Sequence, residues 1–277
     1  LQYLQDIRPE WDKFPGAVYT VAFDTAMPSN RSLQIGTIHE YGTNFAKNYD
    51  IKYLKDDGTY EYANQTTFGM SERLLAAVIG IHGDDTGLIL PPEIAPYQIV
   101  IVPIPGEGVN DYSEKVNDIL KDHGFRTKLD SRENYTPGYK FNDWEMRGVP
   151  VRIEIGSREA SKKTITIALR NIKGKEIVSL SEAVQKIDEA MKRVKEKIVE
   201  DAQKDFEKRI FIADNADDLK APEGLGIAFW CGSKECSDAI EQKYDRTALG
   251  FMNNDDRIGK CVICGKEGKM GVFGRSY

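Results

Sequence analysis

Long apolar runs are missing from this sequence. No stretch of about 18 consecutive apolar residues occurs, and this excludes a membrane helix of the kind that hydropathy identifies. The N-terminal segment has no basic stretch followed by an apolar one, so no secretory signal is predicted. The expected location is therefore cytoplasmic, with no membrane partner.

An excess of positive charge is missing as well. Lysine and arginine number 38 against 44 aspartates and glutamates, which gives a formal net charge of −6. Nucleic-acid-binding domains usually carry a basic surface, so the overall charge does not by itself indicate one. Charge is local, however, and one short segment is basic: Lys162, Lys163, Arg170, Lys173 and Lys175.

Cysteine is scarce, and its placement is informative. Cys231 and Cys236 form one closely spaced pair, Cys261 and Cys264 form another, and a glycine follows the first and the last. Two such pairs separated by a longer insertion are typical of a structural Cys₄ zinc site, in which the metal supplies folding free energy. Two disulfides, free buried thiols and a redox pair are the alternatives. The missing secretory signal and the lack of a thioredoxin-like strand and helix disfavour the first and the last.

Length and composition predict more than one domain. A chain of 277 residues with 40% hydrophobic side chains can bury more than one core. A proline cluster in residues 91–96 indicates a first boundary, and a long amphipathic pattern in residues 179–210 precedes the cysteines. We therefore predict three parts of α/β and α+β class, with bounds 1–95, 96–200 and 201–277.

The first part has the pattern of an antiparallel sheet. Segments rich in β-formers at Tyr19–Phe23 and Leu33–Thr37 are followed by a hairpin that turns at Asp56, Asp57 and Gly58. The sheet leads to Leu74–Ile81, an almost wholly apolar run. That run predicts a helix buried on nearly every side.

Strands and helices alternate in the second part. The pattern predicts a compact α/β domain with a mixed sheet, built from Tyr97–Val102, Ser113–His123, Arg126–Leu129, Asn142–Met146, Val151–Ile155 and Thr164–Leu169. Residues 179–182 look like a capping box, and apolar residues then recur every three or four positions as far as Ile210. One long helix is therefore predicted to connect the second part to the third.

Five stretches of the first part can be compared with known families: residues 13–17, 33–39, 42–45, 65–73 and 82–92. Together they resemble the closing part of the catalytic domain of prolyl-tRNA synthetases, which are class II enzymes. Residues 130–150 are similar to the anticodon-binding domain of the same family, and the cysteine region resembles the extra C-terminal module of the archaeal and eukaryotic form. The resemblance implies part of an antiparallel catalytic sheet in residues 1–95, a mixed-sheet anticodon-binding domain, and a small α+β zinc-binding module.

The resemblance implies a proline-tRNA ligase. Proline and ATP would form prolyl-adenylate and pyrophosphate, and the prolyl group would pass to the 3′ end of tRNA(Pro). Positioning and neutralisation of phosphate charge carry such a reaction, with Mg²⁺ bridging phosphates in related chemistry. The first two class II motifs of the family would precede Leu1, so this chain is expected to be inactive alone.

The resemblance also assigns residues to ATP. Arg73 matches the arginine of the third class II motif, where a planar cation meets phosphate oxygens and acts in catalysis. Gln34 and Thr37 would contact the adenylate through neutral hydrogen bonds. Without the resemblance, Arg73 could equally cap the apolar helix or pair with Glu72.

A proline pocket is implied beside the ATP site. Its walls would be Phe14, His39 and Ser71, because a small apolar ring needs an aromatic surface and a few polar groups to fix its orientation. Taken alone, His39 would be a structural histidine and Phe14 a core residue.

Prolyl anticodons share two guanines, whose edges favour cationic and carboxylate partners. Six residues are candidates for contacts with the anticodon: Arg132, Lys140, Phe141, Arg152, Glu154 and Arg170. Strand alternation puts Arg152 and Glu154 on one face, opposite the core. A simple ion pair on a solvated face is the alternative for these two residues.

Two competing functions stay open. One is a non-catalytic, synthetase-like protein that binds tRNA, and the other is a threonyl or glycyl synthetase with the same anticodon-domain architecture. Residues 130–148 and the four cysteines favour the prolyl form. By analogy with class II synthetases, the complete enzyme is expected to be a homodimer.

Overall fold

The computed structural model describes residues 1–221 and 223–277, which form two compact units. One unit combines Leu1–Ile81 with Gln203–Tyr277, and the other is His82–Ala202. The domain bounds predicted from the sequence divide the chain differently, since residues 1–81 and 203–277 share one sheet. The predicted bounds concern which segments belong to which domain type, and they stay a prediction.

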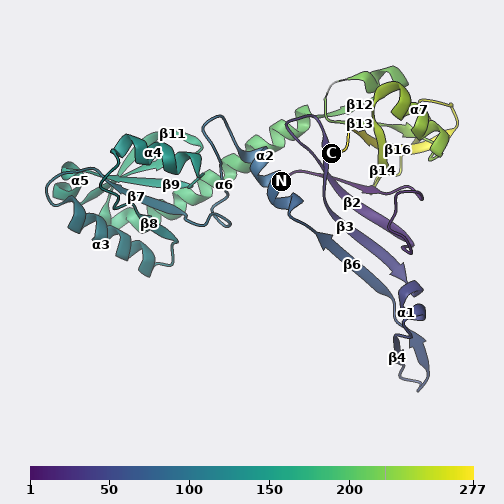
Figure 1. The fold of residues 1–277 in the computed structure, drawn as a ribbon, viewed down its shortest axis with the longest axis horizontal. Helices are drawn as coiled ribbons and strands as arrows, with labels where there is room; N and C mark the ends of the chain where they lie inside the picture. The colour runs from purple at the N-terminus through teal and green to yellow at the C-terminus, as the bar shows by residue number, and fades with distance from the viewer. Residues whose placement is uncertain (222) are drawn as a thin grey trace. The chain divides into compact units, whose positions relative to one another are not determined.

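A nine-stranded sheet forms the centre of the first unit within the described residues, in the order β12-β13-β16-β14-β1-β2-β3-β6 with β15 paired to β16 (Figure 1). Its strands are β1 (Leu4–Ile7), β2 (Tyr19–Ala26), β3 (Ser32–Gly42), β6 (Gln65–Met70), β12 (Ile210–Ile212), β13 (Leu225–Trp230), β14 (Thr247–Met252), β15 (Ile258–Lys260) and β16 (Glu267–Gly274). The pairs β1–β2, β2–β3 and β3–β6 are all antiparallel, which confirms the sheet predicted for the opening segment.

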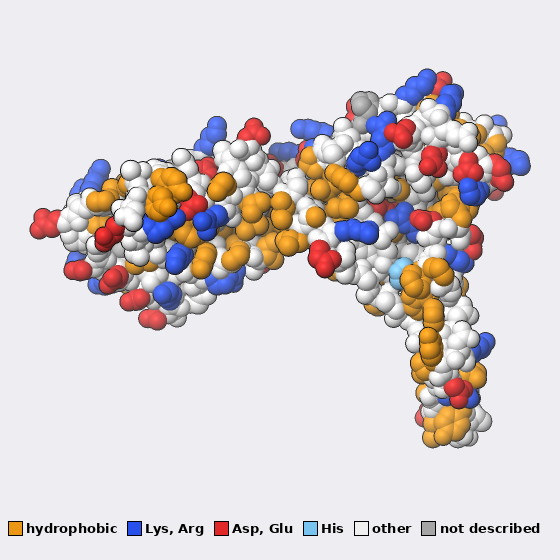
Figure 2. Space-filling view, in the orientation of Figure 1, with side chains coloured by type: hydrophobic (Ala, Val, Ile, Leu, Met, Phe, Trp, Pro, Cys, Tyr) orange, Lys and Arg blue, Asp and Glu red, His pale blue; other side chains and the backbone are white. Residues whose placement is uncertain are grey.

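The predicted hairpin is present as well. Strands β4 (Lys52–Leu54) and β5 (Tyr60–Tyr62) pair antiparallel, and Gly58 between them has a φ of 79°, in the region that glycine adopts at no steric cost. The hairpin exposes Leu54 by 60% and Tyr60 by 71%. Figure 2 shows apolar side chains gathered over this projection.

The helices of this unit are short. They are α1 (Asn44–Asn48), α2 (Arg73–His82) and α7 (Lys234–Tyr244), with a 3₁₀ turn η2 at Ala216–Lys220. Ser233 caps α7 by accepting a hydrogen bond from the Cys236 amide.

The prediction that the apolar helix is buried on nearly every side is wrong. Helix α2 packs one side against a small cluster that contains Met27 and Ile35, and within α2 Ala77 is fully buried there. Leu75 and Ile79 are 56% and 44% exposed. An apolar composition therefore predicted the helix but not how many of its faces are covered.

The unit His82–Ala202 contains a five-stranded sheet in the order β11-β10-β9-β7-β8 within the described residues. Its elements are β7 (Ile99–Pro103), α3 (Val109–Asp122), β8 (Thr127–Leu129), α4 (Pro137–Met146), β9 (Val151–Ile155), α5 (Ser157–Lys162), β10 (Thr164–Leu169), β11 (Ile172–Ser179), a 3₁₀ turn η1 (Leu180–Glu182) and α6 (Ala183–Lys208). Strand β7 pairs parallel with β8 and β9, whereas β9–β10 and β10–β11 are antiparallel. The predicted mixed sheet is confirmed.

Both faces of this sheet carry apolar clusters. On one face, Ile101 and Ile153 pack with residues of α3 and α6 such as Val116 and Ile187. On the other, Val100 and Val102 pack with Trp144 and Val149, and Phe141 lies beside them. Arg152 and Glu154 are in register with Val100 and Val102, so they share this second, covered face. The sequence predicted that Arg152 and Glu154 lie on a face opposite the core. That face is covered by a second apolar cluster, and Glu154 is only 6% exposed.

Helix α6 begins close to its predicted position, but the capping box differs. The Ser179 hydroxyl donates to the Glu182 carboxylate, and Ser179 makes no side-chain cap to the helix backbone. The helix ends at Lys208, so Ile210 starts strand β12 instead of extending the helix as predicted. Among the described residues, no helix is both long enough and apolar enough to cross a bilayer.

Candidate functional site

Strand β3 carries three of the predicted substrate residues. His39 lies in a row of rings, with its centroid 4.9 Å from Phe14 and 6.0 Å from Tyr41. Phe14 is 45% exposed, so its ring lies at the surface and is not a core residue. Tyr41 was not predicted from the sequence, although it follows His39 at the spacing that keeps two side chains on one face of a strand.

Both nitrogens of His39 are engaged. Nδ1 lies 2.9 Å from the Thr20 hydroxyl and Nε2 lies 3.0 Å from the Thr37 hydroxyl. Burial lowers the pKa of His39 below its usual range, so the ring is neutral at pH 7. Thr20 stands opposite His39 in the β2–β3 register, and that pairing could be recognised only once the register was known.

Gln34 and Arg73 line one cavity of about 550 Å³ in the same unit. The cavity wall also includes Arg8 and residues of α7, among them Lys234 and Ser237. Arg73 is exposed, and no carboxylate of the described residues forms an ion pair with its guanidinium, Glu72 included. An unpaired planar cation beside a cavity is suited to anionic oxygens.

Ser71 lies immediately after β6, beside the motif arginine rather than in the aromatic row. Its hydroxyl accepts a hydrogen bond of 3.4 Å from the Arg73 amide. Close approach of β6 to β3 depends on Gly69, where an added Cβ would lie 3.2 Å from the Thr37 hydroxyl. The structure therefore gathers Phe14, Thr37 and His39 in one place, with Gln34 and Arg73 at a neighbouring cavity.

A second cavity, of about 540 Å³, lies in the unit His82–Ala202. Its wall includes Arg152 and three cations of the basic segment: Arg170, Lys173 and Lys175. Glu154 accepts hydrogen bonds from Arg152 at 3.0 Å and from Lys175 at 2.6 Å. The Arg152 guanidinium stands 4.4 Å from the centroid of the Phe141 ring. A buried carboxylate, two cations and an aromatic face thus meet at one place.

The other predicted anticodon residues are engaged within the protein. Arg132 donates to Asp130 and Asp143 at 2.7 and 2.8 Å. The Lys140 ammonium is buried and donates to the Asp130 carbonyl at 3.0 Å. Burial would raise the pKa of Asp130, but hydrogen bonds from Arg132 and Trp144 outweigh burial and lower the pKa to about 2.

Arg170 is engaged in the same way. Its Nε donates to the Leu88 and Glu145 carbonyls, and its two terminal nitrogens reach both oxygens of Asp84. The side chain is 2% exposed. Arg170 thereby fastens residues 84–88 to the sheet, which explains why the compact unit begins at His82 rather than after the proline cluster.

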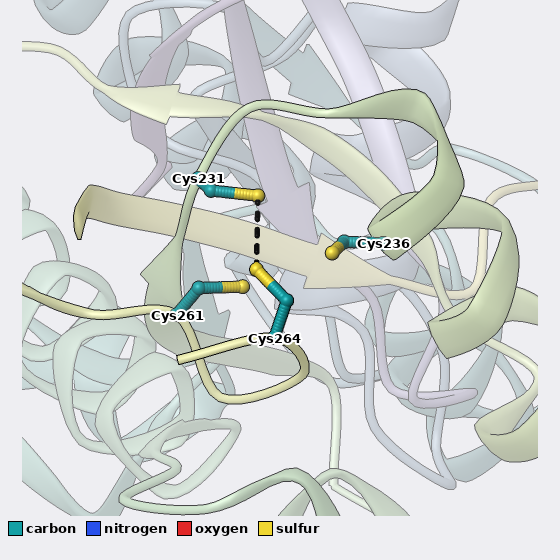
Figure 3. Close-up of side chains that lie close together, drawn as sticks. All are labelled: Cys231, Cys236, Cys261 and Cys264. Carbon is teal, nitrogen blue, oxygen red and sulfur yellow. Dashed lines mark hydrogen bonds between the residues drawn. The ribbon is translucent and has the colours of Figure 1, made fainter. Parts of the chain in front are cut away.

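The four cysteines converge, as Figure 3 shows. All four Sγ atoms lie within 4.8 Å of one another, and those of Cys231 and Cys264 are 3.7 Å apart. A tetrahedral site with Zn–S bonds of about 2.3 Å has edges of about 3.8 Å, so this spacing fits a metal of that size. Glycines 232 and 265 have φ of 83° and 73°, and they turn the chain directly after Cys231 and Cys264.

The thiols are in unlike surroundings. Burial acts to raise the pKa of Cys231, but hydrogen bonds, chiefly from Ser233, lower it to about 6. Burial raises the pKa of Cys236 to about 12. Ser233 contacts both segments, because its hydroxyl lies 3.5 Å from the Cys231 sulfur and also caps α7. Cysteine spacing alone could not identify this serine.

Two family models match parts of the chain. One, described as an anticodon-binding domain, matches residues 98–190, and the other, described as the C-terminal region of prolyl-tRNA synthetase, matches residues 218–277. A protein of Thermoplasma volcanium named Proline--tRNA ligase is 64% identical over all 277 residues of this chain. The chain is therefore similar, over its whole length, to the C-terminal portion of prolyl-tRNA synthetases.

More distant members of the family agree. The Proline--tRNA ligase of Pyrococcus horikoshii is 43% identical and also aligns with the whole chain. The crystal structure of a Cryptosporidium parvum prolyl-tRNA synthetase, complexed with L-proline and AMP, superposes with a TM-score of 0.92 at 32% identity and covers 99% of the chain. The chain spans 60% of the length of each of these prolyl-tRNA synthetases.

Proposed function

We propose that this chain is part of a proline-tRNA ligase, an ATP-dependent aminoacyl-tRNA synthetase. One observation carries the proposal: Gln34, Thr37 and His39 lie along a single strand, in a chain that aligns end to end with proteins named Proline--tRNA ligase. The superposed Cryptosporidium enzyme was crystallised with L-proline and AMP, the amino acid and the nucleotide product expected of this chemistry.

The adenylation step needs charge neutralisation more than it needs a base. An oxygen of the proline carboxylate would bond to the α-phosphorus of ATP, and the bond from that phosphorus to the bridging oxygen would break. Pyrophosphate leaves with the electron pair. We assign Arg73 to the phosphates, since its guanidinium is exposed and has no ion pair within the described residues. Mg²⁺ is the ion that we expect to accompany ATP.

Gln34 and Thr37 are assigned to the adenylate, and Phe14, His39 and Ser71 to proline. The neutral His39 ring, held by two threonine hydroxyls, suits a pocket wall better than a proton shuttle. Phe14 offers an exposed aromatic face for the pyrrolidine ring.

For the anticodon we propose direct contacts from Arg152, Glu154 and Phe141. A carboxylate can accept from the donors of guanine, an arginine can donate to its O6 and N7, and a phenyl ring can stack on an unpaired base. Arg132, Lys140 and Arg170 make several protein contacts each, so we propose that they hold the domain surface in place.

The four cysteines are proposed to bind a structural Zn²⁺. Zinc would be held by four thiolates, which leaves no open coordination position for catalysis. Metal analysis of the purified protein should find about one zinc per chain, and Cys261→Ser should lose the metal and lower the melting temperature. A full complement of zinc in Cys261→Ser would contradict the assignment.

The direct test of the function is ATP–pyrophosphate exchange in an N-terminally extended protein of the relatives' length. We expect exchange that depends on proline and falls about 10²–10³-fold in Arg73→Ala, the loss typical of removing one charge-stabilising donor. Exchange without a requirement for proline, or an unaffected Arg73→Ala variant, would refute the proposal. We expect the complete enzyme to be a cytoplasmic homodimer, which sedimentation of the extended protein can check.

A non-catalytic tRNA-binding protein is the second candidate. It is favoured only by the fact that the chain spans 60% of its relatives' length. Tight binding of tRNA(Pro) by the extended, zinc-loaded protein without any proline-dependent exchange would establish that alternative.

A further inference from the structure

Arg8, which directly follows β1, connects three parts of the first unit. Its NH1 donates to the Leu249 carbonyl at 2.7 Å, and its NH2 donates to Asp24 Oδ2 at 2.7 Å and to Gln34 Oε1 at 2.9 Å. Arg8 is 8% exposed and Asp24 is 1% exposed. The Asp24 carboxylate balances the buried cation at ion-pair distance.

This contact fixes the orientation of the Gln34 amide. An arginine side chain has five donors and no acceptor, so the group that faces Arg8 must be the amide oxygen. The amide nitrogen of Gln34 makes no hydrogen bond with any of residues 1–221 or 223–277. Gln34 lines the cavity of about 550 Å³ that Arg73 also lines. Its two N–H donors are therefore available to a ligand there.

Arg8 is itself held from the C-terminal part of the chain. Leu249 lies where the register of β14 against β16 shifts between Ala248 and Gly250, an irregularity of the β-bulge type. Gly250 permits close approach, since an added Cβ would lie 2.5 Å from the Ile7 carbonyl. The residues that bear the cysteine cluster and the strand that bears Gln34 are thus linked through one guanidinium.

We propose that Arg8 is a positioning residue of the adenylate site, which presents the Gln34 amide donors to the nucleotide. The proposal rests on the assignment of Gln34 to the adenylate made above. Arg8 does not contact the reacting atoms in this scheme. It orients the Gln34 side chain, and the Leu249 carbonyl of strand β14 helps to hold Arg8 in place.

The test uses the N-terminally extended protein and measures affinity for a non-hydrolysable ATP analogue by calorimetry, alongside kcat of proline-dependent exchange. Arg8→Met removes all donors at similar length, and it should weaken analogue binding about tenfold, the equivalent of one good hydrogen bond. Gln34→Ala should weaken binding to a similar extent. The double variant should be no weaker than Gln34→Ala, because residues that act as one unit are not additive.

Arg8→Lys keeps the charge but loses the planar fork, so it should weaken binding less than Arg8→Met does. Arg246 provides a matched control in the same unit. It is 1% exposed and donates to the Leu219, Ala221 and Gly224 carbonyls. Arg246→Met should lower the melting temperature as much as Arg8→Met does and leave analogue affinity unchanged.

Three results would overturn the inference. Additive losses in the double variant would mean that Arg8 does not act through Gln34, and equal losses of affinity in Arg8→Met and Arg246→Met would mean general destabilisation. Normal analogue binding by Gln34→Ala would remove the assignment on which the inference rests. The proposed function fails separately, if the parent protein binds the analogue but shows no proline-dependent exchange.

Discussion

Two buried aspartates, one in each unit, have pKa values that are shifted in opposite directions. Asp130 is 1% exposed and Asp6 is 0% exposed, so burial alone does not distinguish them. Asp130 accepts from Arg132 and from the Trp144 ring nitrogen, and its pKa is lowered to about 2. Neither carboxyl oxygen of Asp6 has a hydrogen-bond partner among the described residues, and burial raises its pKa. Donors, and not depth, decide which carboxyl carries charge.

The hydrogen-bond donors around Asp130 and Asp6 also differ in what they contact. Around Asp130, the donors of Arg132, Lys140 and Trp144 are directed inward and hold the fold. Around Asp6, Arg8 donates to Asp24 and Gln34, and the side-chain nitrogen of Gln34 makes no hydrogen bond within the described residues. A network in which every donor has a partner indicates a structural role, whereas one with a donor left over at a cavity indicates binding.

The largest effect is expected from breaking the Asp130 network. Asp130→Asn keeps the shape but leaves Lys140 without its buried counter-charge and Arg132 with Asp143 alone. Removing one partner of a buried pair costs about 3–5 kcal/mol, so the variant should melt at a clearly lower temperature. Differential scanning calorimetry measures this change. Asp118→Asn, an exposed residue of α3, should change stability by no more than about 0.5 kcal/mol.

If Asp130→Asn and Asp118→Asn melt together, the Asp130 network is not structural and the contrast with Asp6 disappears. Proline-dependent exchange should survive the Asp130 change in the extended protein at temperatures where the variant is folded, because Asp130 is not assigned to the adenylate site.

Glu154 is intermediate between the Asp130 network and the Arg8–Gln34 network. It has two cationic partners and is 6% exposed, yet one of these partners, Arg152, also lines the cavity of the second unit. Glu154→Gln should weaken tRNA(Pro) binding by about 1–3 kcal/mol, the discrimination typical of one good base contact. Filter binding at fixed salt measures the affinity. If Glu154→Gln binds tRNA(Pro) as tightly as the parent but is less stable, Glu154 has a structural role like that of Asp130.

The last prediction concerns Asp6, and its size depends on pH. The raised pKa keeps Asp6 protonated in the fold, whereas the unfolded chain ionises near 3.8. The stability that the protonated group contributes is therefore present below pH 3.8 and is lost as pH rises toward the folded pKa. Asp6→Asn cannot ionise, so its stability relative to the parent should increase steadily as pH rises from 5 to 8.

Urea unfolding at the two pH values tests this prediction. A stability difference between parent and Asp6→Asn that stays constant from pH 5 to pH 8 would show that Asp6 is ionised in the fold. Arg8 would then have two counter-charges, Asp6 and Asp24, and the buried group would resemble Asp130.

Periodicity and turn signals predicted most of the fold. The antiparallel opening strands, the hairpin at Gly58, the mixed sheet and the cluster of four cysteines were all predicted, because each depends on local spacing. Burial was harder to predict. Helix α2 is apolar yet half-exposed, since composition does not say how many neighbours an element has.

Long-range partners could not be predicted at all. Arg8 meets Leu249 across 241 positions, and Arg170 meets Asp84 across 86. No local pattern records such pairs, so the sequence could name Arg170 as a cation but not reveal that its donors are taken. Strand β11 and helix α5 were also missed, being a polar strand and a short polar helix with little hydrophobic signal.

Transfer of labelled proline to tRNA(Pro) by the N-terminally extended, zinc-loaded protein tests the central claim most directly, because it requires the adenylate and anticodon sites to work on one chain. We predict ATP-dependent charging that is abolished by Arg73→Ala and reduced by Glu154→Gln through a higher KM for tRNA. A folded, extended protein that binds tRNA(Pro) but never charges it, in the presence of proline, ATP and Mg²⁺, would contradict the account.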